Sequence, residues 1–149
     1  MTEVRPSLGG LRVMLVEDEV AARVALGHML ARLGASVQQV GDAEHAAKLA
    51  RHLPAHRRPE VVLADYNLPG TDGLQLLGWF DEHLPATRLA LITAQDRYAF
   101  RGSLSPRITF FRKPASFDRI VRYLAGVTGE SCETERPASS WTAEPVLVR

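Results

Sequence analysis

At 149 residues, the chain has the size of one ordinary domain and can bury its own hydrophobic core. Hydrophobic residues make up 46% and charged residues 23% of it, values close to the globular average that argue against a disordered, fibrous or membrane protein. A formal charge of +1 argues against a strongly basic nucleic-acid-binding domain, and the single cysteine, Cys132, excludes an intrachain disulfide. Residues 1–10 hold no signal-peptide core and no later apolar run reaches the length of a membrane span, so we expect a cytoplasmic protein without membrane contact.

The first half of the chain predicts two strands and two helices. Residues 1–10 form an N-terminal extension, and apolar runs predict strands at 12–17 and 35–40. The helix between them has an apolar stripe formed by Ala22, Leu26, Met29, Leu30 and Leu33. Gly34 suits the left-handed conformation that commonly ends a helix. The second helix should start with Asp42 as N-cap and stop before Pro54.

In the second half, strands are expected at 60–65, 87–93 and 107–111. The third helix should start near Thr71 or Asp72 and end before Pro85, and the last should start at Ser116 and end before Gly129. A helix should also join the fourth and fifth strands, but glycine, serine and proline crowd its second half, within residues 95–106. We therefore expect a short or irregular fourth helix.

Alternation of strand-like runs with helical segments predicts an α/β fold with a doubly wound, five-stranded parallel sheet. We assign this domain to residues 11–127. Residues 128–149 form a polar tail with four glutamates and two arginines, hence a charge of −2 against +3 on the rest. Trp141 and the apolar residues 146–148 make this tail a candidate docking segment for its own domain or for a partner.

Polar residues of complementary chemistry follow four of the expected strands. Glu17 ends the first strand and Asp18 follows it, Asp65 and Thr93 end the third and fourth, and Lys113 comes after the fifth. Ligands of open parallel sheets bind at the carboxyl ends of the strands, where these residues converge. Carboxylates suit a magnesium ion, and a lysine and a threonine hydroxyl suit phosphoryl oxygens. The pattern predicts a magnesium pocket that handles a phosphoryl group.

Each of these residues also has an ordinary structural interpretation. The acidic run 17–19 complements a helix N-terminus, Asp65 fits a turn, Thr93 fits a strand and Lys113 fits a solvated surface. Taken singly, these interpretations are favoured for most of them. The convergence of the required residue types on four strand ends favours a site.

Four segments together resemble the receiver domain of bacterial two-component response regulators: LVEDE at 15–19, LADYNLPGTDG at 63–73, LITA at 91–94 and FFRKP at 110–114. The resemblance covers residues 11–127. It implies a flavodoxin-like strand order 2-1-3-4-5 and a role in phosphorelay signal transduction. The phosphoryl group would come from a histidine kinase or phosphotransfer protein, and the protein would catalyse only its own phosphorylation and dephosphorylation.

The resemblance also implies a role for each site residue. Asp65 would be the phosphoacceptor, and Mg²⁺ or Mn²⁺ would bind Asp18, Asp65, the backbone carbonyl of Asn67 and, through water, Glu17. Lys113, after which a cis peptide bond leads into Pro114, would pair with the phosphoryl group. Thr93 and Phe110 would form the switch, and the side chains of Asn67 and Gln95 would tune dephosphorylation.

The output of the switch is less well defined by the sequence. The separation of Thr93 and Lys113, 20 residues, is a little short for the family, and Ser103 to Arg107 replace its usual glycine-bearing run. We expect a single-domain regulator that acts by binding an unknown downstream protein, with a homodimer as a further option and without direct nucleic-acid binding.

Two other functions remain open at this point. A phosphoaspartate phosphatase of the haloacid-dehalogenase type expects an aspartate where Asn67 stands, and a cap domain that does not fit in this length. The second open function is that of a phosphorylation-independent interaction module with the same fold. His52 and His56 are separated by Pro54 and suit solvent better than a metal, and the basic residues around them suit a solvated loop.

Overall fold

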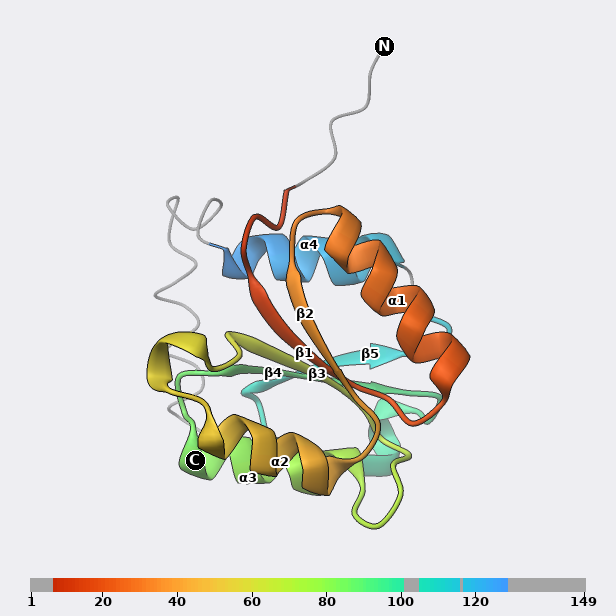
Figure 1. Ribbon diagram of the computed structural model, residues 1–149. Coiled ribbons are helices and arrows are strands. Elements are labelled where there is room, and N and C mark those ends of the chain that lie inside the picture. Colours follow the sequence, from red (N-terminus) through yellow and green to blue (C-terminus); the bar gives the residue numbers. More distant parts are fainter. Residues whose placement is uncertain (1–6, 101–104, 116, 129–149) are drawn as a thin grey trace.

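The computed structural model describes residues 7–100, 105–115 and 117–128, with only the backbone at Arg97 and Tyr98. Within these residues, five strands form one parallel sheet in the order β2-β1-β3-β4-β5 (Figure 1). The strands are β1 (Arg12–Val16), β2 (Ser36–Val40), β3 (Val61–Asp65), β4 (Arg88–Thr93) and β5 (Ile108–Arg112). The predicted doubly wound α/β fold and its flavodoxin-like strand order are confirmed.

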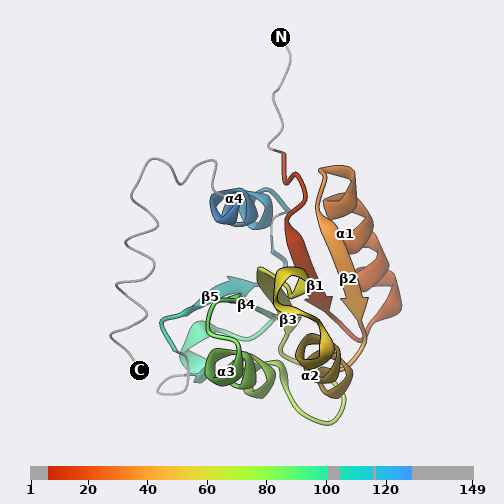
Figure 2. The same cartoon turned by 60° about the vertical axis from the view of Figure 1, so that its left-hand side comes forward.

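Helices cover both faces of the sheet (Figures 1 and 2). α1 (Val20–Arg32) and α4 (Phe117–Val127) lie on one face, and α2 (Ala43–His52) and α3 (Gly73–His83) lie on the other. Successive strand residues point to opposite faces, so Val13 and Leu15 pack beneath α1 and α4, whereas Met14 and Val16 pack beneath α2 and α3. The sheet therefore separates two hydrophobic clusters. Among the described helices, none combines the length and apolar character that a bilayer-spanning segment requires.

Helix ends are set by short polar residues and glycine. Asp42 and Asp72 accept hydrogen bonds from the backbone N–H groups of His45 and Gln75, which caps α2 and α3. Gly34 follows α1 with φ = +104°, a conformation that a residue with a Cβ rarely adopts. The predicted caps are confirmed at these positions, and Asp72 rather than Thr71 begins the third helix.

The connection from β4 to β5 is irregular, as predicted. In the described residues it contains only a 3₁₀ helix, η2 (Arg97–Phe100), while η1 (Ala55–Arg57) lies between α2 and β3. Met29, a member of the predicted apolar stripe, is 42% exposed and lines the groove between α1 and α4. The predictions for Ser116 and the tail, with Trp141, fall outside the described residues.

Candidate functional site

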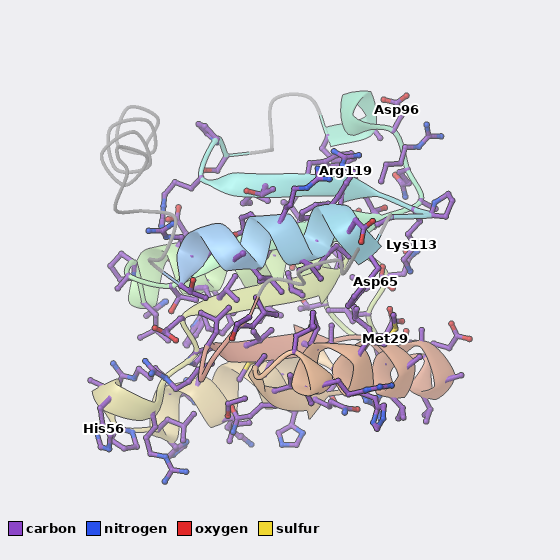
Figure 3. All side chains as sticks on the ribbon, turned by 90° about the horizontal axis from the view of Figure 1, so that it is seen from above. Met29, His56, Asp65, Asp96, Lys113 and Arg119 are labelled. Carbon is purple, nitrogen blue, oxygen red and sulfur yellow. The ribbon has the colours of Figure 1, made fainter. Side chains whose placement is uncertain are left out.

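Four parallel strands bring the polar residues to one edge of the sheet. Glu17 and Asp18 follow the last residue of β1, Asp65 and Thr93 end β3 and β4, and Lys113 follows β5. Figure 3 shows Asp65 and Lys113 next to each other at this edge. The Lys113–Pro114 peptide bond is cis, as the resemblance implies. Strand register therefore gathers side chains that are up to 96 positions apart in sequence, from Glu17 to Lys113.

Three carboxylates converge at this edge. Glu17, Asp18 and Asp65 each offer an oxygen, and these oxygens lie within 4.8 Å of one another. Asp65 is 5% and Glu17 9% exposed, whereas Asp18 is exposed to solvent. Nζ of Lys113 lies 3.3 Å from Oδ1 of Asp65 and 3.8 Å from Oε1 of Glu17. One ammonium group thus pairs with two of the three carboxylates, and the cluster keeps an excess of negative charge.

Burial and the neighbouring charges change the ionisation of Glu17. Burial raises the pKa of its carboxyl above the ordinary value, and the nearby charge of Asp65 raises this pKa further. The backbone N–H of Glu19, which donates to Oε2 of Glu17 over 3.1 Å, and the ammonium of Lys113 act in the opposite direction. The net effect on the pKa of Glu17 is upward, with burial as its main cause.

The donor set fits a hard divalent cation. Oδ1 of Asp65 is buried and accepts no hydrogen bond from the described residues, so its contact there is the ion pair with Lys113. Mg²⁺ and Mn²⁺ prefer oxygen ligands, and a cation between the three carboxylates would remove their repulsion. Because Asp18 is exposed, an ion bound to it would have water on its solvent side.

The hydroxyl of Thr93 is buried next to this cluster at the end of β4. Thr93 is 0% exposed, and its Oγ1 accepts a hydrogen bond of 3.1 Å from the backbone N–H of Gln95. Its carbonyl also accepts a bond of 2.7 Å from the N–H of Lys113, which ties the ends of β4 and β5 together. The side chains of Asn67 and Gln95 are exposed at the rim.

An aromatic group lies behind the site, on the side of α2 and α3. Phe100 of η2 is 5% exposed, and its ring packs edge-on against Tyr66, with 4.9 Å between centroids. The centroid of the Phe100 ring also lies 6.2 Å from that of Phe110. Phe110 is partly buried, whereas Phe111 is buried on the opposite face of β5. Tyr66, the residue after Asp65, is therefore connected to Phe110 through Phe100 of η2.

Sequence reasoning missed three residues that support the site: Gly73, Tyr66 and Phe100. A Cβ on Gly73 would lie 2.1 Å from the carbonyl oxygen of Asp65, so only glycine lets α3 start this close to the end of β3. Its N–H donates to the carbonyl of Tyr66 over 2.8 Å. A glycine directly after an N-cap, where helix propensity disfavours it, was the available signal. For Phe100, the only signal was an aromatic residue in a segment rich in polar residues.

A groove leads away from the carboxylates between α1 and α4. Its volume is about 280 Å³, with Glu17, Asp65 and Lys113 at one end. The remaining walls are largely apolar: Leu15, Val16, Ala22, Ala25, Leu26, Met29, Ile92, Ala115, Phe117 and Ile120. Met29 of α1, which is part of this wall, exposes 42% of its surface. The polar site therefore borders an exposed apolar surface.

Comparison with known proteins gives the same result from an independent direction. The model of the response regulator receiver domain matches residues 13–125. The transcriptional regulatory protein TrcR of Mycobacterium tuberculosis is 32% identical over 131 residues, which make up 86% of this chain and 49% of that protein. A response regulatory protein of Vibrio parahaemolyticus is 29% identical over 130 residues, 85% of this chain and 52% of that one. The chain spans about half the length of these relatives.

Solved receiver domains have the same fold. The receiver domain of the Francisella response regulator 1452 superposes with a TM-score of 0.72 at 16% identity, over 82% of this chain and 99% of that one. The response regulator TrrA of Thermotoga maritima, solved in complex with Mg²⁺ and beryllofluoride, superposes with a TM-score of 0.66 at 23% identity, over 78% and 97% of the two chains. At these identities the likeness concerns the fold alone.

Proposed function

This chain belongs to the response regulator receiver domain family, and on that premise we propose that it is a phosphoacceptor switch that takes a phosphoryl group onto Asp65. The observation that carries the proposal is the buried carboxylate of Asp65, 3.3 Å from the ammonium of Lys113 and within 4.8 Å of the oxygens of Glu17 and Asp18. The family is a signalling domain rather than a classical enzyme, so the substrate is the domain itself.

In the proposed reaction, a carboxylate oxygen of Asp65 attacks the phosphorus of a phosphohistidine on a histidine kinase or phosphotransfer protein. An O–P bond forms, the N–P bond breaks, and the imidazole leaves with the electron pair and takes up a proton. Lys113 neutralises charge on the phosphoryl oxygens. Later attack of water on the phosphorus breaks the O–P bond, releases inorganic phosphate and restores Asp65. The exposed side chains of Asn67 and Gln95 at the rim tune this hydrolysis.

Asp18 and Asp65 would hold Mg²⁺ or Mn²⁺ directly, with the carbonyl of Asn67, and Glu17 would contribute through water. The bound ion supplies neutralisation of charge on the transferring oxygens. The complex of TrrA with Mg²⁺ and beryllofluoride supports the choice of ion by analogy of fold and family. The convergence of three carboxylates on one lysine supports it from this chain's own residues.

Phosphorylation is read out through Thr93 and Phe110. In the unphosphorylated structure, Oγ1 of Thr93 accepts the N–H of Gln95, and its own proton is available to a phosphoryl oxygen. Donation to that oxygen draws the hydroxyl toward Asp65 and leaves space for Phe110 to turn inward. Because this contact between Thr93 and the phosphoryl group is made mainly in the active conformation, it shifts the equilibrium toward that conformation.

The donor protein binds over α1 in this proposal. Ala22, Leu26 and Met29 of α1 line the groove that ends at Asp65 and Lys113, so a donor that covers this groove would bring its phosphohistidine to the site. We further propose a cytoplasmic location, a domain of residues 11–127 followed by the tail, and a downstream protein as the recipient of the signal.

A phosphorylation-independent interaction module is the second candidate. Such a module would need no carboxylate cluster. The buried, mutually repelling pair Glu17 and Asp65 would then destabilise the fold without serving its function. A phosphoaspartate phosphatase would need an acid two positions after Asp65, where the exposed Asn67 stands. The site therefore favours the switch over both alternatives.

The test is to incubate the full chain with Mg²⁺ and acetyl phosphate and to measure its intact mass under mildly acidic conditions. The wild-type protein should gain the mass of one phosphoryl group, and Asp65→Asn should gain none. Beryllofluoride with Mg²⁺ should move NMR signals around Thr93 and Phe110 in the wild type only.

The matched control is Asp42→Asn, a change of the same chemistry outside the site. Asparagine is as good an N-cap as aspartate, so α2 should remain intact and the variant should be phosphorylated normally. A wild-type protein that gains no mass and shows no beryllofluoride response would leave the interaction module as the function.

A further inference from the structure

A second concave surface lies at the amino ends of the strands, opposite the phosphorylation site. It is a cleft of about 400 Å³ whose walls come from the start of β1, the loop before β3, the loop from α3 to β4, and the end of α4. In Figure 3, His56 of the neighbouring η1 lies at the far end of the molecule from Lys113. The cleft is therefore separate from the carboxylate site.

Positive charge dominates this cleft. Arg12, Arg58 and Arg88 line it, and His83 lies at its rim, whereas Glu60 is the one carboxylate among its lining residues. Glu60 is 3.7 Å from a terminal nitrogen of Arg12 and also accepts the backbone N–H of Arg12 over 2.9 Å. One carboxylate against three guanidinium groups leaves a site suited to an anionic ligand.

Two of these guanidinium groups are held in place by the backbone. Nε of Arg12 donates to the carbonyl of Arg58 over 2.7 Å, and Nε of Arg58 donates to the carbonyl of Leu53 over 3.0 Å. Anchoring through Nε orients the terminal nitrogens, one of which, on Arg12, also lies 3.7 Å from Glu60. The exposed Arg57 of η1 extends the same basic surface beyond the cleft. An anion would thus meet preoriented donors, at a smaller entropic cost than on freely rotating side chains.

The chain itself contains an acidic segment that begins at this cleft. Val127, the last residue of α4, is part of the cleft wall, and the next charged residues along the chain are Glu130, Glu133 and Glu135. Residues 129–135 contain no lysine or arginine. Since an extended residue spans about 3.3–3.6 Å, the eight residues after Val127, which is itself part of the cleft wall, can reach roughly 26–29 Å from it.

We propose that residues 129–135 bind the cleft of Arg12, Arg58 and Arg88 as an intramolecular anionic ligand. Attachment at the cleft wall gives the segment an effective concentration in the millimolar range, so weak contacts suffice. Each exposed ion pair contributes little, and all are screened by salt, so the contact is a reversible one that depends on ionic strength. This inference does not depend on phosphorylation of Asp65.

Cys132, the single cysteine of the chain, lies inside the proposed ligand and allows a direct test. A nitroxide attached to Cys132 of the full-length protein should broaden the amide NMR signals of Ala55, Glu60 and Ala86, which line the cleft. Signals of Val20 and Val24 on α1 should stay sharp. Reduction of the nitroxide should restore the broadened signals, and high salt should weaken the effect.

Charge variants separate specific binding from simple proximity. Neutralising the segment with Glu130→Gln, Glu133→Gln and Glu135→Gln together should abolish most of the broadening, whereas Glu144→Gln, outside the segment, should leave it unchanged. Equal broadening in the triple variant would overturn the proposal. A mixing experiment gives a second way to overturn it. Protein that carries the nitroxide but no ¹⁵N is mixed with ¹⁵N-enriched protein that carries no nitroxide. Broadening in this mixture would show that the segment binds a second copy.

Discussion

Glu17 shows how a single residue of the site works against the stability of the fold. Folding buries its carboxyl beside Asp65, and burial is the main reason that its pKa lies above the ordinary value of 4.5. For an acid with a raised pKa in the folded state, the favourable contribution is present below the unfolded-state value and is lost as pH rises through the folded-state value. Ionised Glu17 therefore destabilises the metal-free protein.

Glu17→Gln should consequently raise the melting temperature of the chelator-treated protein at neutral pH. Glutamine keeps an oxygen to accept the N–H of Glu19 and cannot ionise. The advantage of the variant should shrink as the pH falls toward 4.5, where Glu17 of the wild type also becomes neutral. Calorimetry across this range measures the effect. Glu82→Gln, an exposed charge deletion outside the site, is the control, and a lower melting temperature for Glu17→Gln at neutral pH would contradict the argument.

At the scale of residues, the sequence allowed the polar members of the site to be predicted because parallel strands end at one edge. Asp65 and Lys113 are 48 positions apart, yet both are placed by strand ends that a simple apolar pattern reveals. Gly73 and Phe100 could not be predicted in the same way. Their importance lies in a contact with one backbone oxygen and in the packing of one ring, which only the folded chain defines.

Among the elements, α3 depends on a close approach to the end of β3. An alanine at Gly73 would place its Cβ 2.1 Å from the carbonyl oxygen of Asp65, a backbone atom that can move only with the site. Overpacking of this kind costs about 1–3 kcal/mol, so Gly73→Ala should lower the free energy of unfolding by that amount. It should also slow phosphorylation by acetyl phosphate, because Asp65 itself is displaced.

The same helix offers the matched control. A Cβ on Gly78 would meet nothing within 4 Å, so Gly78→Ala should stabilise the protein by about 0.5–1 kcal/mol through helix propensity. Urea denaturation of both variants gives the two free energies. If Gly73→Ala were as stable as Gly78→Ala, the contact between α3 and the end of β3 would not be limiting.

The short helix η2 stands in the connection from β4 to β5, where a regular crossover helix is absent from the described residues. Phe100 anchors it between Tyr66 and Phe110, so Phe100→Ala should cost about 3 kcal/mol, the lower end of the range for a buried phenylalanine, because a surface element relaxes more easily than a core. Val24→Ala, at a position 48% exposed, should change stability by no more than about 0.5 kcal/mol. A Phe100→Ala effect as small as that of Val24→Ala would mean that η2 is not anchored there.

An irregular connection at 95–106 was predictable from its glycine, serine and proline content, but the position of η2 was not. Turn-forming residues indicate where a regular helix fails, and they carry no information about which side chain fixes the remaining turn. Periodicity had a similar limit in α1. It identified the helix, yet Met29 is exposed because the groove between α1 and α4 leaves that part of the helix uncovered.

In the molecule as a whole, the two ends of the sheet carry opposite charge. Carboxylates gather at the carboxyl ends of the strands and arginines at the amino ends, with two hydrophobic clusters between them. A cation at one end and an acidic segment at the other would each relieve repulsion among like charges. Both ends would therefore contribute to the stability of the complete protein through what they bind.

Magnesium should accordingly stabilise the whole domain, since the cluster of Glu17, Asp18 and Asp65 exists only when the chain is folded. At ten times the dissociation constant, the gain is about 1.4 kcal/mol, which corresponds to a rise in melting temperature of roughly 3–6 °C for a domain of this size. Asp18→Asn removes one ligand and should reduce this rise, whereas Glu19→Gln, its exposed neighbour outside the cluster, should keep it. Thermal unfolding with and without Mg²⁺ compares the three proteins, and an equal rise in all of them would show that the ion binds elsewhere.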